Sequence, residues 1–417
     1  MLDLKLLRDD PSGMSAMLAR RGAGDAVARI LDLDARRRVA QTRADELRAE
    51  QKTLGRDVAK LQGDEKQALL AKLSDLSASV DAVIADEAAL AVELREALLR
   101  VPNTPHASVP DGASEDDNEI LRIVGTPRPG DGLVDHLDLG VALGGIDTER
   151  GARTSGARFA YLSGPVANLW WAIARYAVSV AEQHGFTFVL PPVLVRRDAM
   201  EGTGFFPAAE DQIYTIPDDE LYLVGTSEVP LAAFHMDEIL DPADVPLRYV
   251  AHSACFRREA GAAGKDTRGI FRLHQFEKVE MFVFTTPEDS WAEHERLIAI
   301  EEQVLAGLEL PYRAVALCTA DMGAPSAKTV DLEVWFPAQG RYRETTSCSN
   351  TTDYQARRLN TRIKAADGNV IAHTLNGTVA TSSRHVAAVI ENHQQADGSV
   401  RVPAVLQAFL GADVLRA

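Results

Sequence analysis

The sequence has few cysteines and no long apolar run. Three cysteines occur in 417 residues, Cys255, Cys318 and Cys348, an odd number spaced far apart. This pattern excludes a disulfide framework and a CxxC zinc site and favours a reducing compartment, so we expect a cytoplasmic protein. No apolar run reaches the length of about 18 residues that a membrane helix needs. The opening MLDLKLLRDDP also lacks the apolar centre of a signal peptide, so we expect no membrane segment.

The overall composition is that of a globular protein with an excess of acid. Hydrophobic residues make up 46% of the chain and charged residues 25%, and the length predicts two or three domains. The formal net charge is −17, which on average repels nucleic acid. Because a local patch can override an average, the charge has to be considered segment by segment.

Two heptad patterns predict a long helical hairpin over residues 28–100. Apolar positions recur in steps of three and four from Ala40 to Leu61 and again from Leu69 to Ala97, with Gly63-Asp64 between the two series. Each series places one apolar stripe on a helix, and so short a break makes neighbouring helices antiparallel. The stripe carries polar Gln51 and Glu87, so we expect the hairpin to belong to something larger.

The two predicted helices differ in charge. Residues 28–61 hold nine Lys or Arg against six Asp or Glu, whereas residues 64–100 hold four against eight. The basic helix fits either a solvated face with intrahelical ion pairs or a strip that contacts RNA phosphates. The residues alone leave both interpretations open.

A proline-rich segment separates this arm from a mixed region. Residues 101–118, VPNTPHASVPDGASEDDN, end the helix, and we place domains at 1–108 and 109–417. Beyond the break, strands are expected near 186–190, 222–224, 278–284 and 332–336, and helices near 165–184, 287–307 and 350–365. The two kinds of element do not alternate regularly, which favours an α+β fold with an antiparallel sheet.

Four polar segments in this region have the composition of a catalytic site. Residues 256–284 combine arginines, glutamates and an aromatic around a glycine-rich loop, and arginine forks suit phosphate or carboxylate. Residues 343–350 place an acid before hydroxyl and amide groups, as a hard cation such as Mg²⁺ prefers. The other two segments are 225–228 and 375–384. The run from Gly261 to Lys265 is no phosphate loop, because its spacing is wrong and Asp266 follows the lysine.

These segments, in this order, resemble those of the bacterial seryl-tRNA synthetases, a family of class II aminoacyl-tRNA synthetases. FRREAGAAGKDTRGIFRLHQFEKVEM is similar to motif 2, LNGTVATSSRHVAAVIENHQQADGSVRVP to motif 3, and VGTSEVPL to the TxE loop. HGFTFVLPPVL, with Pro192, is similar to motif 1 and its dimer interface. The resemblance covers essentially the whole chain. It implies a class II antiparallel-sheet catalytic domain that carries an N-terminal antiparallel two-helix coiled-coil arm.

The resemblance also implies a reaction and a set of substrate-binding residues. The family activates L-serine with ATP to seryl-adenylate and then transfers serine to the 3′-terminal adenosine of tRNA(Ser), and of tRNA(Sec) where it is present. Arg257 and Arg384 match its catalytic arginines, and Glu344 and Ser347 match its Mg²⁺ ligands. The implied ATP-binding residues are Arg257, Arg258, Glu259, Leu273, Phe276, Glu344, Thr345, Thr346, Ser347 and Arg384. The implied serine-binding residues are Thr226, Ser227, Glu228, Glu280 and Thr378.

By the same resemblance, the arm grips the long variable arm of tRNA(Ser), usually across a homodimer. Such contacts go to phosphates and position the RNA. The candidate side chains are Arg36, Arg37, Arg43, Arg48, Lys52 and Arg56.

The chain departs from the family at motif 3, where Val379 and Ser383 replace glycines. Two other functions are compatible with a fold of this kind. A relative that loads an amino acid onto a carrier protein tends to lack the tRNA arm, which is intact here. An RNA-binding protein that has lost catalysis should have a damaged ATP site, yet the matching residues Arg257, Glu259, Phe276, Glu344 and Arg384 are all present.

Overall fold

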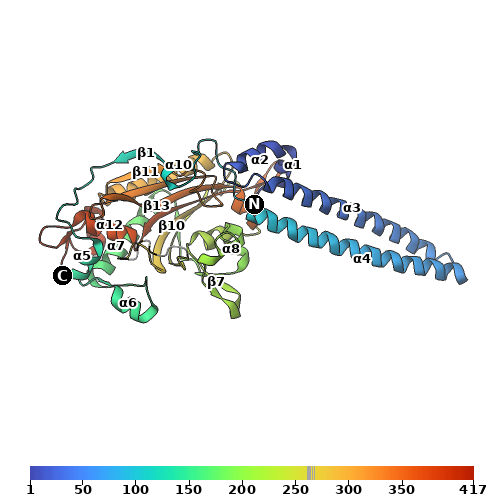
Figure 1. Ribbon diagram of the computed structural model, residues 1–417, viewed down its shortest axis with the longest axis horizontal. Helices are drawn as coiled ribbons and strands as arrows, with labels where there is room; N and C mark the ends of the chain where they lie inside the picture. The colour runs from blue at the N-terminus through green and yellow to red at the C-terminus, as the bar shows by residue number, and fades with distance from the viewer. Residues whose placement is uncertain (261–263, 265, 267) are drawn as a thin grey trace. The chain divides into compact units, whose positions relative to one another are not determined.

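The computed structural model describes residues 1–260, 264, 266 and 268–417 (Figure 1). The remaining positions, 261–263, 265 and 267, fall in the glycine-rich loop of motif 2, so Lys265 lies outside the described residues. The chain forms two compact units. One comprises residues 2–102, and the other comprises residues 103–417 together with Met1.

The N-terminal unit consists of two short helices and a long hairpin. Helices α1 (Leu4–Asp9) and α2 (Pro11–Ala19) precede α3 (Ala26–Val58) and α4 (Gly63–Arg100), which run side by side in Figure 1. The predicted hairpin is therefore present. The heptad positions nearer its base are buried, as expected for a two-helix seam. The buried apolar side chains of the hairpin are Val27, Ile30, Leu33, Ala40, Ala44, Leu47, Leu76, Val80, Leu90, Leu94 and Leu98.

An ion pair explains one polar position in the seam. Glu87 of α4 accepts a hydrogen bond from the Arg37 Nε of α3 at 2.8 Å, and both side chains are partly exposed. Nearer the tip, Leu54 and Leu73 are only half-buried. The seam therefore has its tightest apolar packing away from the tip.

The larger unit is built on one eight-stranded sheet. The strand order is β1-β11-β12-β13-β16-β10-β9-β4, and every neighbouring pair is antiparallel except β4 and β9. The predicted antiparallel α+β architecture is confirmed. In chain order the strands are β1 (Glu119–Val124), β4 (Thr187–Val189), β9 (Leu247–Phe256), β10 (Gln275–Thr285), β11 (Tyr312–Ala316), β12 (Lys328–Phe336), β13 (Arg341–Thr352) and β16 (His373–Thr381).

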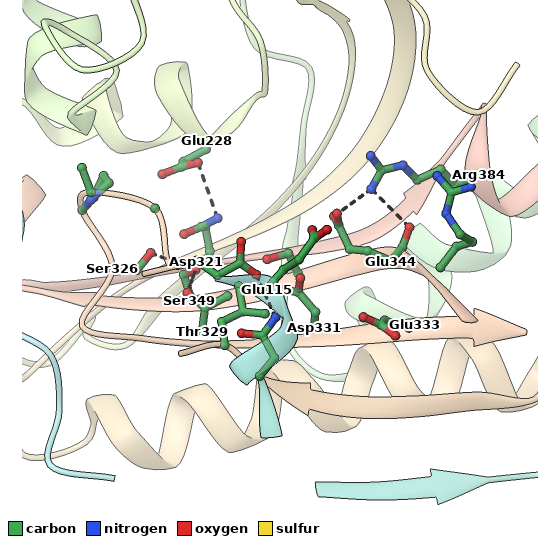
Figure 2. A pocket seen from close by; sticks show the side chains of 18 of the residues that line it. Glu115, Glu228, Asp321, Ser326, Thr329, Asp331, Glu333, Glu344, Ser349 and Arg384 are labelled. Carbon is green, nitrogen blue, oxygen red and sulfur yellow. Dashed lines mark hydrogen bonds and ion pairs between the residues drawn. The ribbon is translucent and has the colours of Figure 1, made fainter. Parts of the chain in front are cut away.

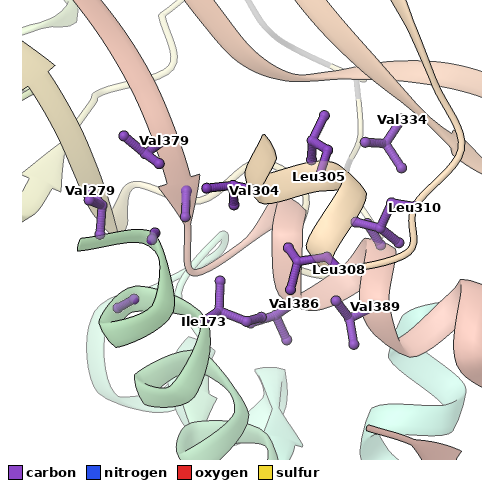
Figure 3. Close-up of a cluster of buried hydrophobic side chains, with 14 of the residues drawn as sticks. Ile173, Val279, Val304, Leu305, Leu308, Leu310, Val334, Val379, Val386 and Val389 are labelled. Carbon is purple, nitrogen blue, oxygen red and sulfur yellow. The ribbon is translucent and has the colours of Figure 1, made fainter. Parts of the chain in front are cut away.

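Three helices pack against this sheet and enclose the main core. Helices α7 (Gly164–Gln183), α10 (Ser290–Gly307) and α12 (Arg384–His393) contribute apolar side chains that meet those of β10, β12 and β16 (Figure 3). Ile173, Val304 and Val386 are fully buried there. Burial of this kind contributes on the order of 1.5–3 kcal/mol for each large aliphatic side chain. The core thus fixes one face of the sheet and leaves the other for polar residues.

The remaining elements are short. The helices are α5 (His136–Ala142), α6 (Thr148–Ser155), α8 (Arg197–Thr203), α9 (Glu228–Ala232), α11 (Tyr354–Leu359) and α13 (Ala404–Leu410). The strands of the small sheets are β2 (Ile146–Asp147), β3 (Tyr161–Leu162), β5 (Leu194–Val195), β6 (Thr215–Ile216), β7 (Leu221–Leu223), β8 (Ile239–Leu240), β14 (Arg362–Ala365), β15 (Gly368–Ile371), β17 (Val400–Arg401) and β18 (Val414–Leu415). Single 3-10 turns lie at Glu115–Asp117, Glu210–Gln212, Pro217–Asp219 and Ala233–His235.

One predicted helix is wrong in extent. Residues 350–365 contain the end of β13, the single short helix α11 and the strand β14. Asn360 ends α11 in the left-handed conformation with φ 56°, and the Asn350 side chain bonds the Thr352 backbone N–H at 2.9 Å. These local bonds compete with helix continuation. The helices predicted at 165–184 and 287–307 correspond to α7 and α10.

A buried carboxyl group lies behind the sheet. Glu301 of α10 is fully buried, and no described residue makes a hydrogen bond of normal geometry to either of its oxygens, although the Thr346 hydroxyl lies close to it. A Cβ on Gly377 of β16 would lie 2.7 Å from Glu301 Oε1, so glycine makes room for this carboxyl. Burial raises the pKa of Glu301 well above its ordinary value of 4.5.

Replacing Glu301 with glutamine should change how stability depends on pH. Because the folded chain raises the pKa of Glu301, folding takes up a proton at any pH between the unfolded and folded values. The wild-type free energy of unfolding should therefore fall, relative to that of Glu301→Gln, as the pH rises from about 5 to about 8. Urea denaturation at several pH values measures this difference.

Glu295→Gln is the matched control, because this glutamate lies on the same helix with a side chain that is 68% exposed. It should leave the wild-type pH dependence unchanged. Parallel stability curves for wild type and Glu301→Gln would contradict the neutral state of the buried carboxyl.

Candidate active site

A polar cavity of about 740 Å³ opens on the sheet face opposite the main core (Figure 2). Its floor comes from β12, β13 and β16, and Gly204, Phe205 and residues 321–326 lie at its sides. Several acids face into it together with Arg384, as Figure 2 shows. The carboxylates in the lining are Glu115, Asp116, Glu228, Asp321, Asp331, Glu333 and Glu344. A smaller cavity of about 60 Å³ adjoins it and shares Phe271, Arg272, Glu344 and Arg384.

Arg257 lies at the wall of the smaller cavity, directly after β9. Its backbone N–H donates to the His274 carbonyl at 2.9 Å, and its Nε donates to the Gly225 carbonyl at 3.2 Å. Its guanidinium carbon is 5.5 Å from the centroid of the Phe276 ring. The bond to Gly225 ties this arginine to the TxE segment and leaves other guanidinium N–H groups to meet an anion.

Arg384 and Glu344 form the second charged group of the site. Arg384 begins α12 and pairs with the Glu344 carboxylate of β13 at 2.7 Å. The Arg384 guanidinium carbon also lies 5.0 Å from the Phe271 ring centroid, and that of Arg343 lies 3.8 Å from it. Desolvation opposes ionisation of Glu344, but the charges of Arg384 and Arg257 outweigh it and hold its pKa below the ordinary value.

Salt bridges hold the described part of the motif 2 loop. Glu259 has φ 52°, a left-handed conformation, and its carboxylate accepts from Arg272 at 2.6 Å. The Arg258 side chain is exposed, and its backbone N–H bonds the Gln212 carbonyl at 2.8 Å. Glu259 and Arg272 both line the smaller cavity, whereas Arg258 lines neither cavity.

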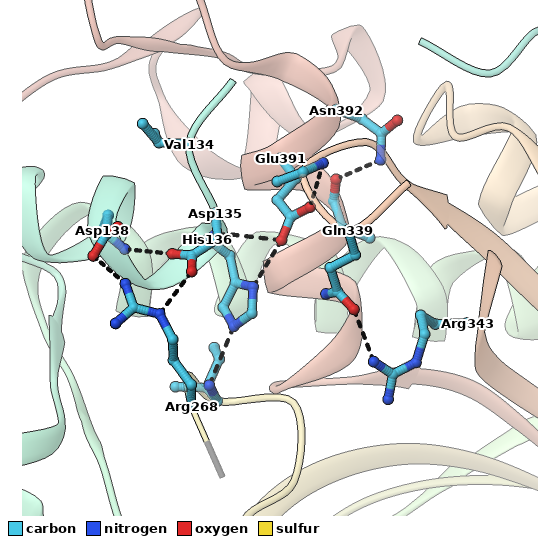
Figure 4. Close-up of polar contacts among 12 residues, drawn as sticks. Val134, Asp135, His136, Asp138, Arg268, Gln339, Arg343, Glu391 and Asn392 are labelled. Atoms are coloured by element: carbon cyan, nitrogen blue, oxygen red, sulfur yellow. Dashed lines mark hydrogen bonds and ion pairs between the residues drawn. The ribbon is translucent and has the colours of Figure 1, made fainter. Parts of the chain in front are cut away.

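The returning arm of this loop is anchored beside α5 and α12 (Figure 4). Arg268 pairs with Asp135 at 2.8 Å, and the Ile270 backbone N–H meets His136 Nε2 at 3.3 Å. His136 Nδ1 in turn lies 2.8 Å from the Glu391 carboxylate. A Cβ on Gly269 would lie 2.2 Å from His136 Nε2, so only glycine permits this approach. These contacts therefore fix the position of the backbone just before Phe271 and Arg272.

Two buried carboxylates define the part of the site next to the TxE segment. Asn376 of β16 connects them, with its Nδ2 atom 3.5 Å from Glu228 Oε2 and 3.3 Å from Glu280 Oε1. Gln355 donates to Glu228 Oε1 at 2.7 Å. Burial, and then the charge of Glu280, raise the pKa of Glu228 to about 7. A cation entering here would favour the ionised form of Glu228.

The other residues expected to bind serine or ATP are divided between the two cavities and the buried interior. Thr378 and Leu273 line the smaller cavity, as do Thr345, Phe276 and Glu259, while Ser347 lines the larger one. The Thr226 hydroxyl accepts from the Glu228 backbone N–H at 3.1 Å, and the buried Ser227 hydroxyl has no partner among the described residues. Thr346 lines neither cavity, because its side chain is fully buried beside Glu301. Any contact between Thr346 and ATP must therefore use its backbone.

The two motif 3 substitutions affect the pocket differently. Val379 is fully buried in the main core (Figure 3), so its added bulk lies away from the cavities. Ser383 lines the smaller cavity and is 5% exposed.

The donors at Glu344 and Ser347 suit a hard cation. Among the described residues, no group of three His, Cys, Asp or Glu side chains is arranged to hold a metal ion. Mg²⁺ does not need such a cage, because it keeps several waters and binds one or two carboxylates plus substrate phosphates. Asp331 lies opposite Ser347 in the β12–β13 pairing, and its buried Oδ1 has no hydrogen-bond partner among the described residues. Burial and the neighbouring Glu344 raise the pKa of Asp331, a cost that a nearby cation would relieve.

Sequence reasoning left three lining residues without a role. Asn376 and Asp331 line the larger cavity and Lys278 the smaller one. The alternation of side chains along a strand could have identified Asn376, because Asn376 and Thr378 are two positions apart on β16 and share a face. Asp331 could be placed in the site only from the register between β12 and β13. Lys278 could be placed there only from the register between β10 and β16.

Comparisons with known proteins identify the family of the chain. Residues 1–105 match the seryl-tRNA synthetase N-terminal domain, and residues 214–393 match the tRNA synthetase class II core domain (G, H, P, S and T). The serine–tRNA ligase of Nocardia farcinica is 50% identical over 419 residues, which cover 100% of this chain and 99% of that protein. That of Streptomyces coelicolor is 50% identical over 416 residues, 99% of this chain and 98% of that one.

Solved structures give the same result. The crystal structure of seryl-tRNA synthetase from Pyrococcus horikoshii complexed with ATP superposes with a TM-score of 0.93 at 40% identity, covering 100% of this chain and 99% of that one. Prolyl-tRNA synthetase of Giardia lamblia shares only the fold, with a TM-score of 0.58 and 15% identity over 67% of this chain and 56% of that one.

The antiparallel sheet with this arginine-lined cavity defines a class II aminoacyl-tRNA synthetase. Within that class, the chain belongs to the seryl-tRNA synthetase family.

Proposed function

We propose that the cavity joins L-serine to ATP and that each charged residue named below has one task in that step. The serine carboxylate attacks the α-phosphorus, a new P–O bond forms, the α–β phosphoanhydride bond breaks, and pyrophosphate leaves. A ribose hydroxyl of the 3′-terminal adenosine of tRNA(Ser) then attacks the carbonyl carbon, loses its proton and releases AMP. The convergence of Arg257, Arg384 and Glu344 beside the buried acids Glu228 and Glu280 carries this proposal.

Arg257 orients the first step. The attacking carboxylate is already ionised at neutral pH, so the step needs no general base. What it needs is two anions held in line, and a planar arginine fork can donate to both. The position of Arg257, between the TxE segment and Phe276, supports this assignment.

ATP occupies the side of the site that includes Phe276, Leu273, Glu259 and Arg384. An aromatic face and an arginine can stack on the two faces of adenine, while Glu259 accepts from its amino edge. To do so, the Glu259 carboxylate must either release Arg272 or bind Arg272 and the adenine amino group together. Arg258 is exposed, so its part in ATP binding is a backbone or loop contact.

Magnesium would be held by Glu344 and Ser347. When bound with ATP, it would neutralise charge on the phosphate oxygens. In the described structure Arg384 already pairs with Glu344, so this arginine keeps the carboxylate turned toward the cavity.

The serine side of the pocket uses two acids and the hydroxyl of Thr378. Glu228 and Glu280 accept from the substrate ammonium, and Thr378 lies next to Glu280. A site built to bond a hydroxyl can reject an analogue that lacks it by roughly 10⁴–10⁵-fold. Threonine keeps the hydroxyl, so the confined pocket excludes its methyl group by shape.

The hairpin binds the tRNA through phosphates. Four of the six candidate arginines and lysines have carboxylate partners within the hairpin: Arg36 with Asp32, Arg37 with Glu87, Arg43 with Glu46, and Arg48 with Asp45. Lys52 and Arg56 are exposed, and among the described residues no carboxylate pairs with them. These two are therefore the strongest phosphate contacts, while the intrahelical pairs account for part of the basic strip.

A homodimer and a cytoplasmic location complete the proposal. Trp171 of α7 is 53% exposed and Leu190, after β4, is 72% exposed, and both lie in or near the motif 1 region. Exposed apolar side chains of this size are suited to a subunit interface. None of the helices in the described part of the chain combines the length and hydropathy needed to span a bilayer.

Serine should drive pyrophosphate–ATP exchange by the wild-type chain far better than alanine or threonine. In Arg257→Ala this exchange should fall by at least about 10²–10³-fold, because the fork that meets both anions is gone. Isotope exchange with each amino acid measures both effects.

Arg416→Ala is the matched control, since Arg416 is 67% exposed and its only carboxylate partner among the described residues is Asp397. It should exchange at the wild-type rate. Equal rates with serine and alanine would overturn the substrate assignment, and near-normal exchange by folded Arg257→Ala would overturn the role of Arg257.

Removing Lys52 and Arg56 together should weaken tRNA charging without affecting exchange. In K52A/R56A the KM for tRNA(Ser) should rise, and the dependence of binding on salt should become shallower, because fewer counterions are released. Aminoacylation at several salt concentrations tests this prediction. Lys66→Ala, an exposed lysine on α4, should behave like the wild type. Unchanged charging by K52A/R56A would exclude these side chains as phosphate contacts.

A further inference from the structure

Lys278 is a buried cation that the reaction outlined above does not use. It lies on β10, is 5% exposed, and lines the smaller cavity. Its ammonium group is 2.5 Å from Glu280 Oε2 and 3.5 Å from Thr378 Oγ1. Buried lysines are rare unless they are paired, so this placement calls for a specific role.

The strand pairing explains why these three side chains meet. Lys278 and Glu280 are two positions apart on β10 and therefore share a face of the sheet. Glu280 lies opposite Thr378 of β16, just after an irregularity in the register at Val279. The arrangement depends on strands that are about 100 residues apart in the chain.

The hydrogen-bonding capacities of the three groups fix the direction of each bond. An ammonium can only donate, and a carboxylate paired with it accepts. Thr378 lies 3.1 Å from the same oxygen, Glu280 Oε2, so its hydroxyl proton points to that oxygen. Because Lys278 Nζ donates to the Thr378 oxygen at 3.5 Å, one lone pair of that oxygen is left to accept a further hydrogen bond.

The opposite edge of Glu280 remains for the substrate. Its Oε1 meets only the Asn376 amide, at 3.3 Å, among the described residues, and Asn376 leads on to Glu228 in the larger cavity. Lys278 thus pairs with one oxygen of Glu280, and the Asn376 amide links the other oxygen to Glu228, which lines the larger cavity. The substrate ammonium is proposed to bind beside these acids.

We propose that Lys278 is a positioning residue for substrate specificity: it fixes Glu280 so that the Thr378 hydroxyl accepts a hydrogen bond from the hydroxyl of the substrate. The inference rests on the proposed serine site. Alanine has no hydroxyl to donate, so it would leave the Thr378 lone pair unpaired in a buried site. Lys278 acts through its neighbours and touches neither reacting atom.

Lys278→Met tests this role because methionine has a similar length and no charge. The kcat/KM for serine in pyrophosphate exchange should fall by about 10- to 100-fold, the loss expected when a charged hydrogen-bond partner is removed. The kcat/KM for alanine should stay nearly constant, so the serine-to-alanine ratio falls by the same factor. The KM for ATP should be unchanged. Lys278→Arg should recover most of the ratio.

Lys328→Met is the matched control, because Lys328 on β12 is also partly buried and is absent from the lining of both cavities. It should keep the wild-type ratio. Thermal unfolding checks that each variant is folded.

A double-mutant cycle with Thr378→Val separates positioning from general damage. If Lys278 acts through Thr378, adding Lys278→Met to Thr378→Val should barely change the serine-to-alanine ratio. This comparison also remains informative if the lysine variant is less stable, since the ratio is measured within each folded protein.

Three results would overturn the inference. The first is an unchanged serine-to-alanine ratio in Lys278→Met. The second is an equal loss with both amino acids, which indicates a structural role. The third is a raised KM for ATP, which indicates a direct phosphate contact. The failure of the proposed function looks different, because the wild-type chain itself would then show no serine-dependent exchange.

Discussion

The pairing of β10 with β16 is the constraint on which the site depends. It places Glu280 opposite Thr378 and brings Asn376 within reach of both Glu280 and Glu228. A slip of one residue would turn these side chains into the core on the other face. The apolar residues between them, Val279 on one strand and Val379 on the other, resist such a slip because they are fully buried. Core packing and site geometry are therefore set by the same register.

Individual residues on the strands of the site also contact a polar group on the other face of the sheet. Gly377 lies between Asn376 and Thr378, and the space left by its missing side chain is taken by the carboxyl of Glu301 from α10. Thr346, which follows Glu344 by two residues, is buried toward the same carboxyl. A polar group beneath the sheet thus touches the two strands that carry Glu344 and Thr378, and its neutral form avoids the cost of a buried charge.

Local charge in the site departs from that of the chain as a whole. The protein carries a net charge of −17, yet Arg257 and Arg384 face the cavity together, and salt bridges hold Arg272 and Arg343 nearby. Acids in the same cavity keep these arginines in place before any ligand enters. The arrangement suits two anionic reactants, because the positive groups are oriented in advance and need not reorganise during the reaction.

The sequence alone determined the class of fold and the helical hairpin, and it supplied most residues of the proposed site, because heptad spacing and ordered motifs are local patterns. It failed at 350–365, where Asn360 ends the short helix α11 in the left-handed conformation, and it did not place Lys278, Asp331 or Asn376 in the site. Only the tertiary structure decided that these three residues line the cavities. Each depends on which residue of one strand faces which residue of another, and that register is a non-local property that no spacing along the chain records.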